Sequence, residues 1–231
     1  MPGKLCRERG HIWEKPRGGP DLIRSLDFAE PFFQVDYIEN EDTYPVGSRS
    51  ILLNMSESPL EIIGSPLPFL HSTIVRQVTI RQVTKALIVK NFEQCCPDDP
   101  DTFSRLVHSW KSLWEYSGLE RNRGIPYYKS PRAAVGNAGM NFCLAEAGIP
   151  SAIHQKHEQS FEEIHLQICG TGKVQKLSAN DPRTVYQEYA LCPGTTHEPL
   201  SQPDGEYPWH NYYSISRGIF IVIEMKRGGE G

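Results

Sequence analysis

The sequence lacks the features that mark several large classes of protein. Its six cysteines include no CxxC pair, and such scattered thiols suit a reducing compartment better than a disulfide framework. No stretch approaches the roughly 18 consecutive apolar residues of a membrane span, and residues 1–19 lack the apolar core of a secretory signal. With 24 Lys+Arg against 28 Asp+Glu, there is no basic excess for nucleic acid. We therefore expect a cytoplasmic protein that binds neither membranes nor nucleic acid.

Nucleotide-binding fingerprints and repeats are also missing. Gly170-Thr-Gly172-Lys173 lacks the full spacing of a phosphate loop, and Ala134-Val-Gly136-Asn137-Ala-Gly139 lacks the GxGxxG register. No segment recurs at the period of a solenoid. These glycines predict turns between strands.

The composition of the first half predicts an extension rather than a separate domain. Residues 1–50 are rich in Pro, Gly and charge and indicate an extended arm or loop. Prolines interrupt residues 51–69, which favours short edge strands. Residues 71–92 are dominated by β-branched side chains and predict one or two strands. We expect residues 1–97 to form an arm and edge strands that pack on a barrel formed by residues 98–231.

The second half begins with one predicted helix and continues in short segments. An apolar stripe with helical spacing covers residues 98–118 and predicts a helix that packs on the outside of a sheet. Its members are Phe103, Leu106, Val107, Trp110, Leu113 and Trp114. From about residue 125, short apolar runs alternate with Gly and Pro turns, which is typical of a sandwich or closed barrel. The fold class expected is mainly β, with one flanking helix.

The histidines are unevenly distributed. Five of the eight lie within a 57-residue window, namely His154, His157, His165, His197 and His210. In the strand around them, alternation places Glu163, His165 and Gln167 on one face and Ile164, Leu166 and Ile168 on the other. The polar face either meets solvent or lines a barrel, where ligands far apart in sequence can share one ion. Imidazole and carboxylate together suit Fe, Mn, Ni, Co or Zn.

This region resembles the cupin superfamily. Gly148 is followed by five residues and His154, and Glu163 is followed by six residues and Gly170, as in the first motif of that family. Pro193-Gly194-Thr195-Thr196-His197 is similar to the second motif, with the proline moved next to the glycine. The resemblance covers roughly residues 135–225 and implies a double-stranded β-barrel, or jelly roll, that binds a metal.

The resemblance implies a ligand set of His157, Glu163 and His197, with His154 or Gln155 as the fourth ligand. The spacing His154-x-x-His157 departs from the His-x-His of the family, so the two imidazoles would lie on opposite faces of an ideal strand. A β-bulge between them would restore convergence. Otherwise only one of the two points inward.

Other polar and aromatic residues are candidates for contact with a substrate. His165 and His210 are candidate catalytic residues that would move protons. Gln167, Trp209 and Tyr212 are candidates for substrate binding. For each of them the alternative is an ordinary place in a polar or aromatic core.

The cupin resemblance implies a metal-dependent enzyme acting on an oxygen-bearing small organic molecule. Among the metals, Fe(II) is favoured over Mn, Ni, Co or Zn. Among the reactions, dioxygenase-type oxidation is favoured. One alternative is an isomerase, cyclase or lyase in which the metal is only a Lewis acid and histidine moves the proton. A second is a non-catalytic module that binds a small ligand. Relatives with N-terminal strand extensions often exchange edge strands, so we also expect a homodimer.

Overall fold

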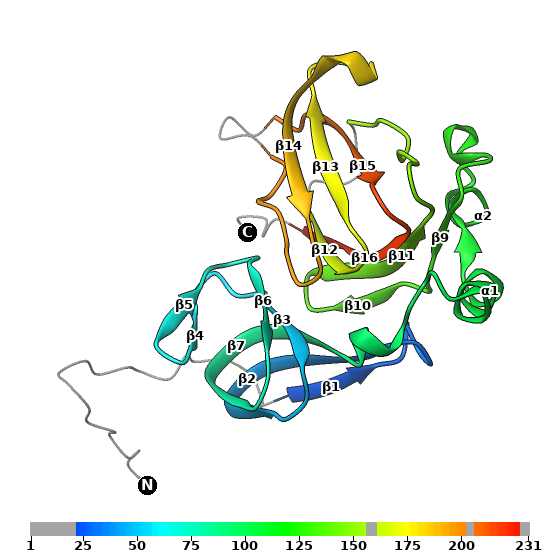
Figure 1. Cartoon of the computed structure of the whole chain (residues 1–231). Helices are drawn as coiled ribbons and strands as arrows, with labels where there is room; N and C mark the ends of the chain where they lie inside the picture. The colour runs from blue at the N-terminus through cyan, green and yellow to red at the C-terminus, as the bar shows by residue number, and fades with distance from the viewer. Residues whose placement is uncertain (1–21, 156–160, 202–205, 227–231) are drawn as a thin grey trace, which may run out of the picture.

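A computed structural model describes residues 22–155, 161–201 and 206–226 (Figure 1). The N-terminal residues form a five-stranded sheet, with strands in the order β1 (Leu22–Leu26), β2 (Gln34–Val46), β7 (Val78–Lys90), β3 (Ser50–Asn54) and β6 (Ser72–Val75). A small hairpin joins β4 (Leu60–Ile62) to β5 (Ser65–Leu67). All of the pairings are antiparallel.

The C-terminal half forms two further antiparallel sheets. The larger has the order β12 (Phe161–Cys169), β16 (Gly218–Lys226), β11 (Ala138–Ala145), β9 (Tyr127–Lys129) and β8 (Lys111–Ser112), and β10 (Ala133–Val135) also pairs with β11. The smaller consists of β14 (Val185–Leu191), β13 (Gly172–Leu177) and β15 (Trp209–Ser214). Three 3-10 turns complete the elements, at η1 (Phe92–Gln94), η2 (Glu120–Asn122) and η3 (Pro182–Thr184).

The larger C-terminal sheet lies between the other two layers (Figure 1), and both of its faces carry buried apolar residues. One face, with Phe142, Leu166 and Ile221, packs against the N-terminal sheet in a shared core. The other face, with Phe220 and Val222, packs against the three-stranded sheet in a second core. The burial of both faces explains why β11 and β16 are almost continuous apolar runs.

The two C-terminal sheets face each other and enclose the second core. Isolated bridges join Leu166 of β12 to Thr196, in the connection after β14, and Tyr213 of β15 to Pro150, in the connection before β12. The predicted fold class, mainly β with antiparallel sheets that face each other and a flanking helix, is confirmed by this arrangement.

The prediction of an extended arm over residues 1–50 is wrong for residues 22–46. That stretch contains β1 and the 13-residue strand β2, which pairs with β7 along most of its length. The prediction of edge strands over residues 51–69 also fails for β3, which lies between β7 and β6 and is buried throughout. Residues 1–21 lie outside the described part of the chain.

The predicted helix over residues 98–118 is interrupted. The helix α1 (Pro100–Ser109) is capped by the Asp99 side chain and ends where Trp110 adopts an extended conformation. After the short strand β8, a capping box formed by Ser112 and Glu115 starts α2 (Leu113–Ser117). None of the helices in the described ranges has the length and apolar character needed to cross a membrane.

Candidate metal centre

The strand β12 places its polar face inside the barrel. Glu163, His165 and Gln167 are 4%, 4% and 0% exposed, so the alternative of a polar face in solvent is wrong. Val222 and Phe220 on β16, which pair with His165 and Gln167, belong to the enclosed core. Ile164 and Leu166 face the N-terminal sheet. The alternation predicted from sequence therefore gives the observed orientation.

Three ligand-type side chains converge at one end of this interior. One nitrogen each of His154 and His210 and one oxygen of Glu163 lie within 4.8 Å of one another. His154 and His210 are held together by a pair of backbone hydrogen bonds of 3.0 and 2.9 Å, and their rings lie 4.1 Å apart. A segment before β12, the start of β12 and the start of β15 thus each contribute one donor.

Backbone carbonyls fix the orientation of both imidazoles. His154 Nδ1 lies 3.0 Å from the carbonyl oxygen of Ala152, and His210 Nδ1 lies 3.1 Å from that of Pro208. Because a carbonyl can only accept, both Nδ1 atoms carry the proton and donate it. The Nε2 atoms of both rings are then the nitrogens available to the centre, which is the usual second-shell arrangement of metal-binding histidines.

The carboxylate of Glu163 is ionised despite its burial. Burial alone would raise its pKa, but the adjacent imidazoles of His210, His165 and His154 hold the pKa of Glu163 well below its usual range. Its Oε1 lies 3.7 Å from His210 Nε2 and 3.4 Å from His165 Nε2. A buried negative charge is therefore surrounded by imidazole nitrogens.

His165 is linked to His197, which lies outside the three-donor group. His197 donates from Nδ1 to the carbonyl oxygen of Glu198 at 2.6 Å, so its Nε2 accepts from the backbone N–H and from the Nδ1 of His165, both at 2.9 Å. Burial lowers the pKa of His165 to about 3 and that of His197 to about 4, so both rings are neutral at pH 7. The Nε2 lone pair of His165 consequently faces the carboxylate of Glu163 with no proton between them.

This donor set fits a divalent transition metal. Two imidazole nitrogens and one carboxylate oxygen lie within 4.8 Å of one another, and a cation between them would offset the repulsion between Glu163 and the His165 lone pair. His154, Glu163 and His210 are the residues that would hold the ion. Because the set is mixed N/O and contains no thiolate, it suits Fe, Mn, Co, Ni or Zn.

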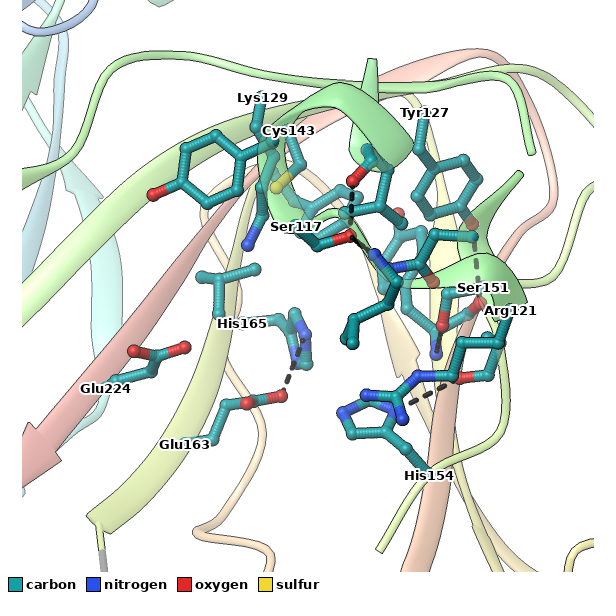
Figure 2. Close-up of a pocket in the computed structure, with 18 residues that line it drawn as sticks. Ser117, Arg121, Tyr127, Lys129, Cys143, Ser151, His154, Glu163, His165 and Glu224 are labelled. Atoms are coloured by element: carbon teal, nitrogen blue, oxygen red, sulfur yellow. Dashed lines mark hydrogen bonds and ion pairs between the residues drawn. The ribbon is translucent and has the colours of Figure 1, made fainter. Parts of the chain in front are cut away.

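A cavity of about 270 Å³ opens beside this group (Figure 2). His154, Glu163 and His165 line it, while His210, 1% exposed, lies behind them. The remaining wall combines rings with two cationic side chains, among them Tyr116, Arg121, Lys129, Tyr127, Tyr212 and Phe220. The rings of Tyr212 and Phe220 stack at 3.9 Å and give the cavity a flat apolar side.

The structure brings together only some of the residues singled out from sequence. His154 and Glu163 are joined by His210, which the sequence indicated as a catalytic residue, and not by His197. Tyr212 lines the cavity and donates to Gln167 Oε1 at 2.8 Å, but Gln167 itself does not reach the cavity. Trp209 does not line it either, because alternation along β15 turns Trp209 away from the side that carries His210 and Tyr212. His157 lies outside the described residues.

Sequence reasoning missed the residues at the mouth of the cavity. Arg121 follows α2 in η2, and Lys129 ends β9, a strand with no distinctive polar pattern. The apolar stripe predicted a helix on the outside of a sheet, whereas α2 and η2 form one wall of the cavity. One sequence signal was available. The predicted helix over residues 98–118 ends a few residues before the short apolar segment that starts at about residue 125, and such a short connection keeps the last turn of the helix near the barrel.

Comparison with known proteins gave likenesses of structure only. No family model matches the sequence, and no curated protein matches it. Solved structures similar to part of the chain include KdgF from Halomonas sp., at 13% identity and a TM-score of 0.33 over 45% of this chain and 82% of that one. Ectoine synthase from P. lautus has 14% identity and a TM-score of 0.33, over 44% of this chain and 64% of that one.

A third likeness extends over both halves of the chain. A mutant of salicylate 1,2-dioxygenase from Pseudoaminobacter salicylatoxidans, solved with gentisate, has 9% identity and a TM-score of 0.39 over 90% of this chain and 75% of that one. Scores this low identify no activity for the present chain. The fold assignment therefore depends on the strand pairing, and the candidate metal centre on the geometry given above.

Proposed function

We propose that this chain is an enzyme that holds one divalent transition metal at His154, Glu163 and His210 and acts on a small organic molecule in the adjoining cavity. The observation that carries the proposal is the convergence of two imidazoles and a buried, ionised carboxylate at one end of a cavity of about 270 Å³. Three protein ligands leave coordination positions open, as catalytic metal sites require. A site with a purely structural role would be closed by protein ligands.

Fe(II) is the metal that we favour, with dioxygen as the second substrate. Two histidines and one carboxylate form the ligand set of many non-haem Fe(II) oxygenases. When bound, ferrous ion would supply the electrons that activate dioxygen. Mn, Co, Ni and Zn accept the same donors.

The side chains of the barrel have separate roles in this proposal. Glu163 and His154 present the ligand atoms to the cavity, and His210 completes the set from its buried position. The stacked rings of Tyr212 and Phe220 provide a wall against which an organic substrate can lie. The Tyr212 hydroxyl is held by Gln167, so this wall is fixed in position.

One observation favours a second candidate, an isomerase, cyclase or lyase reaction that uses no dioxygen. His165 lines the cavity as a neutral imidazole, and its hydrogen bond to His197 leaves Nε2 ready to accept a proton. In that case the metal would act only as a Lewis acid that polarises the substrate.

Metal analysis followed by oxygen measurement tests the proposal. Protein purified without chelator or His-tag should bind about one equivalent of Fe(II), Mn(II), Co(II), Ni(II) or Zn(II) per chain. The Fe(II)-loaded protein should then consume dioxygen in step with product when small hydroxylated and aromatic compounds are screened. Product formed at the same rate without oxygen would support the second candidate. Failure to bind any of these ions would remove both and leave a non-catalytic module.

Adjacent carboxylates on β12 provide a matched pair of variants. Glu163→Gln keeps the size of the side chain but removes the buried charge, and metal affinity should fall by at least about 100-fold, beyond the roughly 10–100-fold typical of second-shell changes. Glu162 points the other way and accepts from Ser201 Oγ at 2.8 Å, so Glu162→Gln should retain the metal. Equal metal affinity in the two variants would contradict the assignment.

A further inference from the structure

The cavity beside the candidate metal centre is lined by two cationic side chains. Lys129 enters from β9 and is half-buried, and Arg121 enters from η2 and is exposed at the mouth. Figure 2 shows the Lys129 side chain above Glu163 and His165, and the Arg121 side chain on the other side of the view, beside His154. The strand β9 and the turn η2 therefore each contribute one positive charge to the lining of this cavity, whose carboxylates are Glu163 and Glu224.

Among the described residues, neither cation is paired with a carboxylate, although nearby arginines are. Arg132 pairs with Glu224 at 2.6 Å, and Arg123 pairs with Glu120 at 3.1 Å. Within the ranges that the structure describes, Arg121 and Lys129 form no ion pair with a carboxylate. The Lys129 ammonium instead lies 5.0 Å from the centroid of the Tyr116 ring. The charge of these two groups is available to a ligand.

The segment that carries Arg121 is held in place by its own hydrogen bonds. The buried Asn122 donates from Nδ2 to Ser117 Oγ at 2.8 Å, and Ser117 Oγ donates to the carbonyl oxygen of Leu113 at 2.7 Å. Tyr116 donates to Asn141 Oδ1 of β11 at 3.3 Å, which ties α2 to the barrel. Arg121 is thus presented from an anchored turn, an arrangement that lowers the entropy cost of binding.

We propose that the substrate is a small organic acid whose anionic group is bound by Arg121 and Lys129. The inference rests on the proposed function for the placement of the reacting end of the substrate at His154 and Glu163. The planar guanidinium of Arg121 matches an oxyanion in bidentate fashion, while Lys129 acts as a point charge. Electrostatic attraction is strong in such a partly enclosed site, where a bound metal would add further positive charge.

The size and lining of the cavity narrow the chemical class of the acid. At about 270 Å³ the cavity lies at the lower end of the roughly 300–1,000 Å³ of drug-sized sites, so one ring or a short chain fills it. The stacked rings of Tyr212 and Phe220 form an apolar part of the lining. An acid with a planar apolar body matches this surface.

Binding of defined probes tests the inference without requiring turnover. Benzoate, phenyl phosphate and the neutral benzamide are titrated by calorimetry into the metal-free and the Zn(II)-loaded protein. At least one of the two anions should bind, and benzamide should bind at least about 10-fold more weakly, as expected for the loss of charge-assisted hydrogen bonds. Comparison of the two anions distinguishes a carboxylate site from a phosphate site.

Variants assign the binding to these two side chains. Arg121→Gln and Lys129→Gln should each weaken anion binding by about 10-fold or more, with metal content unchanged and with binding restored in Lys129→Arg. Arg123→Gln is the matched control, because Arg123 lies two residues from Arg121, pairs with Glu120 and does not line the cavity. It should leave the affinity for the anion unchanged.

The outcomes separate this inference from the proposed function. If neither anion binds in either form, or if anion affinity is the same in Arg121→Gln, Lys129→Gln and the unmodified protein, the inference is overturned even when one metal ion is bound. Equal affinity for benzoate, phenyl phosphate and benzamide would overturn it as well. If anions bind the metal-free protein and depend on Arg121 and Lys129, but no metal binds, the inference stands and the proposed function fails.

Discussion

At the scale of single residues, the centre depends on which nitrogen of each histidine is bonded to the backbone. Carbonyl groups occupy Nδ1 of His154 and His210, and this leaves Nε2 of both rings directed to Glu163. His197 has the same kind of backbone bond, but its Nε2 is already engaged by His165. The histidine of the second predicted motif, His197, therefore hydrogen-bonds to His165, and in the proposed centre the third ligand atom comes from His210.

The part of the site that sequence predicted follows from local geometry. Alternation on one strand was enough to place Glu163, His165 and Gln167 inside the barrel. The choice between His197 and His210 was not predictable, because it depends on where two separate loops return to the barrel. That Trp209 faces away from His210 and Tyr212 follows from the same alternation, since all three lie on the single strand β15.

The burial of His197 predicts a loss of stability in mild acid. Burial lowers its pKa to about 4, below the roughly 6.5 of an unfolded histidine, so the unfolded state binds the proton first. The contribution of neutral His197 is complete above pH ~6.5 and is lost as the pH falls toward 4, amounting to about 2 kcal/mol at pH ~5. Urea unfolding of chelator-treated protein at pH ~6.5 and at pH ~5 measures this loss of free energy of unfolding. His197→Gln should show a shallower pH dependence, and an unchanged slope would contradict the account.

At the scale of secondary-structure elements, the barrel was predicted better than the sheet that packs against it. Apolar runs such as β16 are recognisable as strands because burial on both faces leaves few polar positions. In β2, by contrast, the acidic run Glu39-Asn40-Glu41-Asp42 interrupts the apolar pattern, and only tertiary pairing with β7 makes this segment a strand. The interruption of the predicted helix has a similar cause, because Lys111 and Ser112 pair with β9.

The turn between β12 and β13 provides a prediction at this scale. Gly170 has a φ of +70°, and a Cβ there would lie 2.4 Å from the carbonyl oxygen of Arg217. Gly148 has a similar φ of +73° but no atom within 4 Å of such a Cβ. Gly148→Ala should therefore cost only the strain of the left-handed conformation, about 1–2 kcal/mol. Gly170→Ala should cost about 1–3 kcal/mol more because backbone must also move.

Urea unfolding of the two alanine variants measures this difference. If both variants lose the same free energy of unfolding, the close contact between a Cβ at Gly170 and the β15–β16 connection adds nothing to the cost of the substitution, and the prediction is wrong. The metal content of Gly148→Ala should remain that of the unmodified protein, since its turn makes no contact that the substitution would disturb.

At the scale of the whole molecule, the N-terminal sheet and the barrel share one core. Phe33 stacks on Phe142 of β11 at 4.7 Å, and Phe32 and Phe142 both contact Trp110 after α1. The face of the larger C-terminal sheet opposite the site is thus covered by residues that sequence assigned to an arm and edge strands. The sequence predicted that residues 1–97 pack on the barrel as an arm and edge strands, but not that they form a five-stranded sheet.

The shared core predicts that the two halves unfold together. Phe33→Ala should reduce the free energy of unfolding by about 3–5 kcal/mol, as expected for the loss of a buried aromatic ring. Tryptophan fluorescence and far-ultraviolet circular dichroism should still report a single, coincident transition in urea. Two separate transitions, with only one shifted by the substitution, would show instead that the sheet and the barrel are independent.

The central claim is that His210, with His154 and Glu163, holds the metal, and that His197 does not. The most direct measurement is the number of Co(II) equivalents retained after dialysis by the unmodified protein, His210→Gln and His197→Gln, with the exposed His108→Gln as control. We predict about one equivalent for the unmodified protein, His197→Gln and His108→Gln, and almost none for His210→Gln. A full equivalent in folded His210→Gln, or its loss in folded His197→Gln alone, would contradict the account.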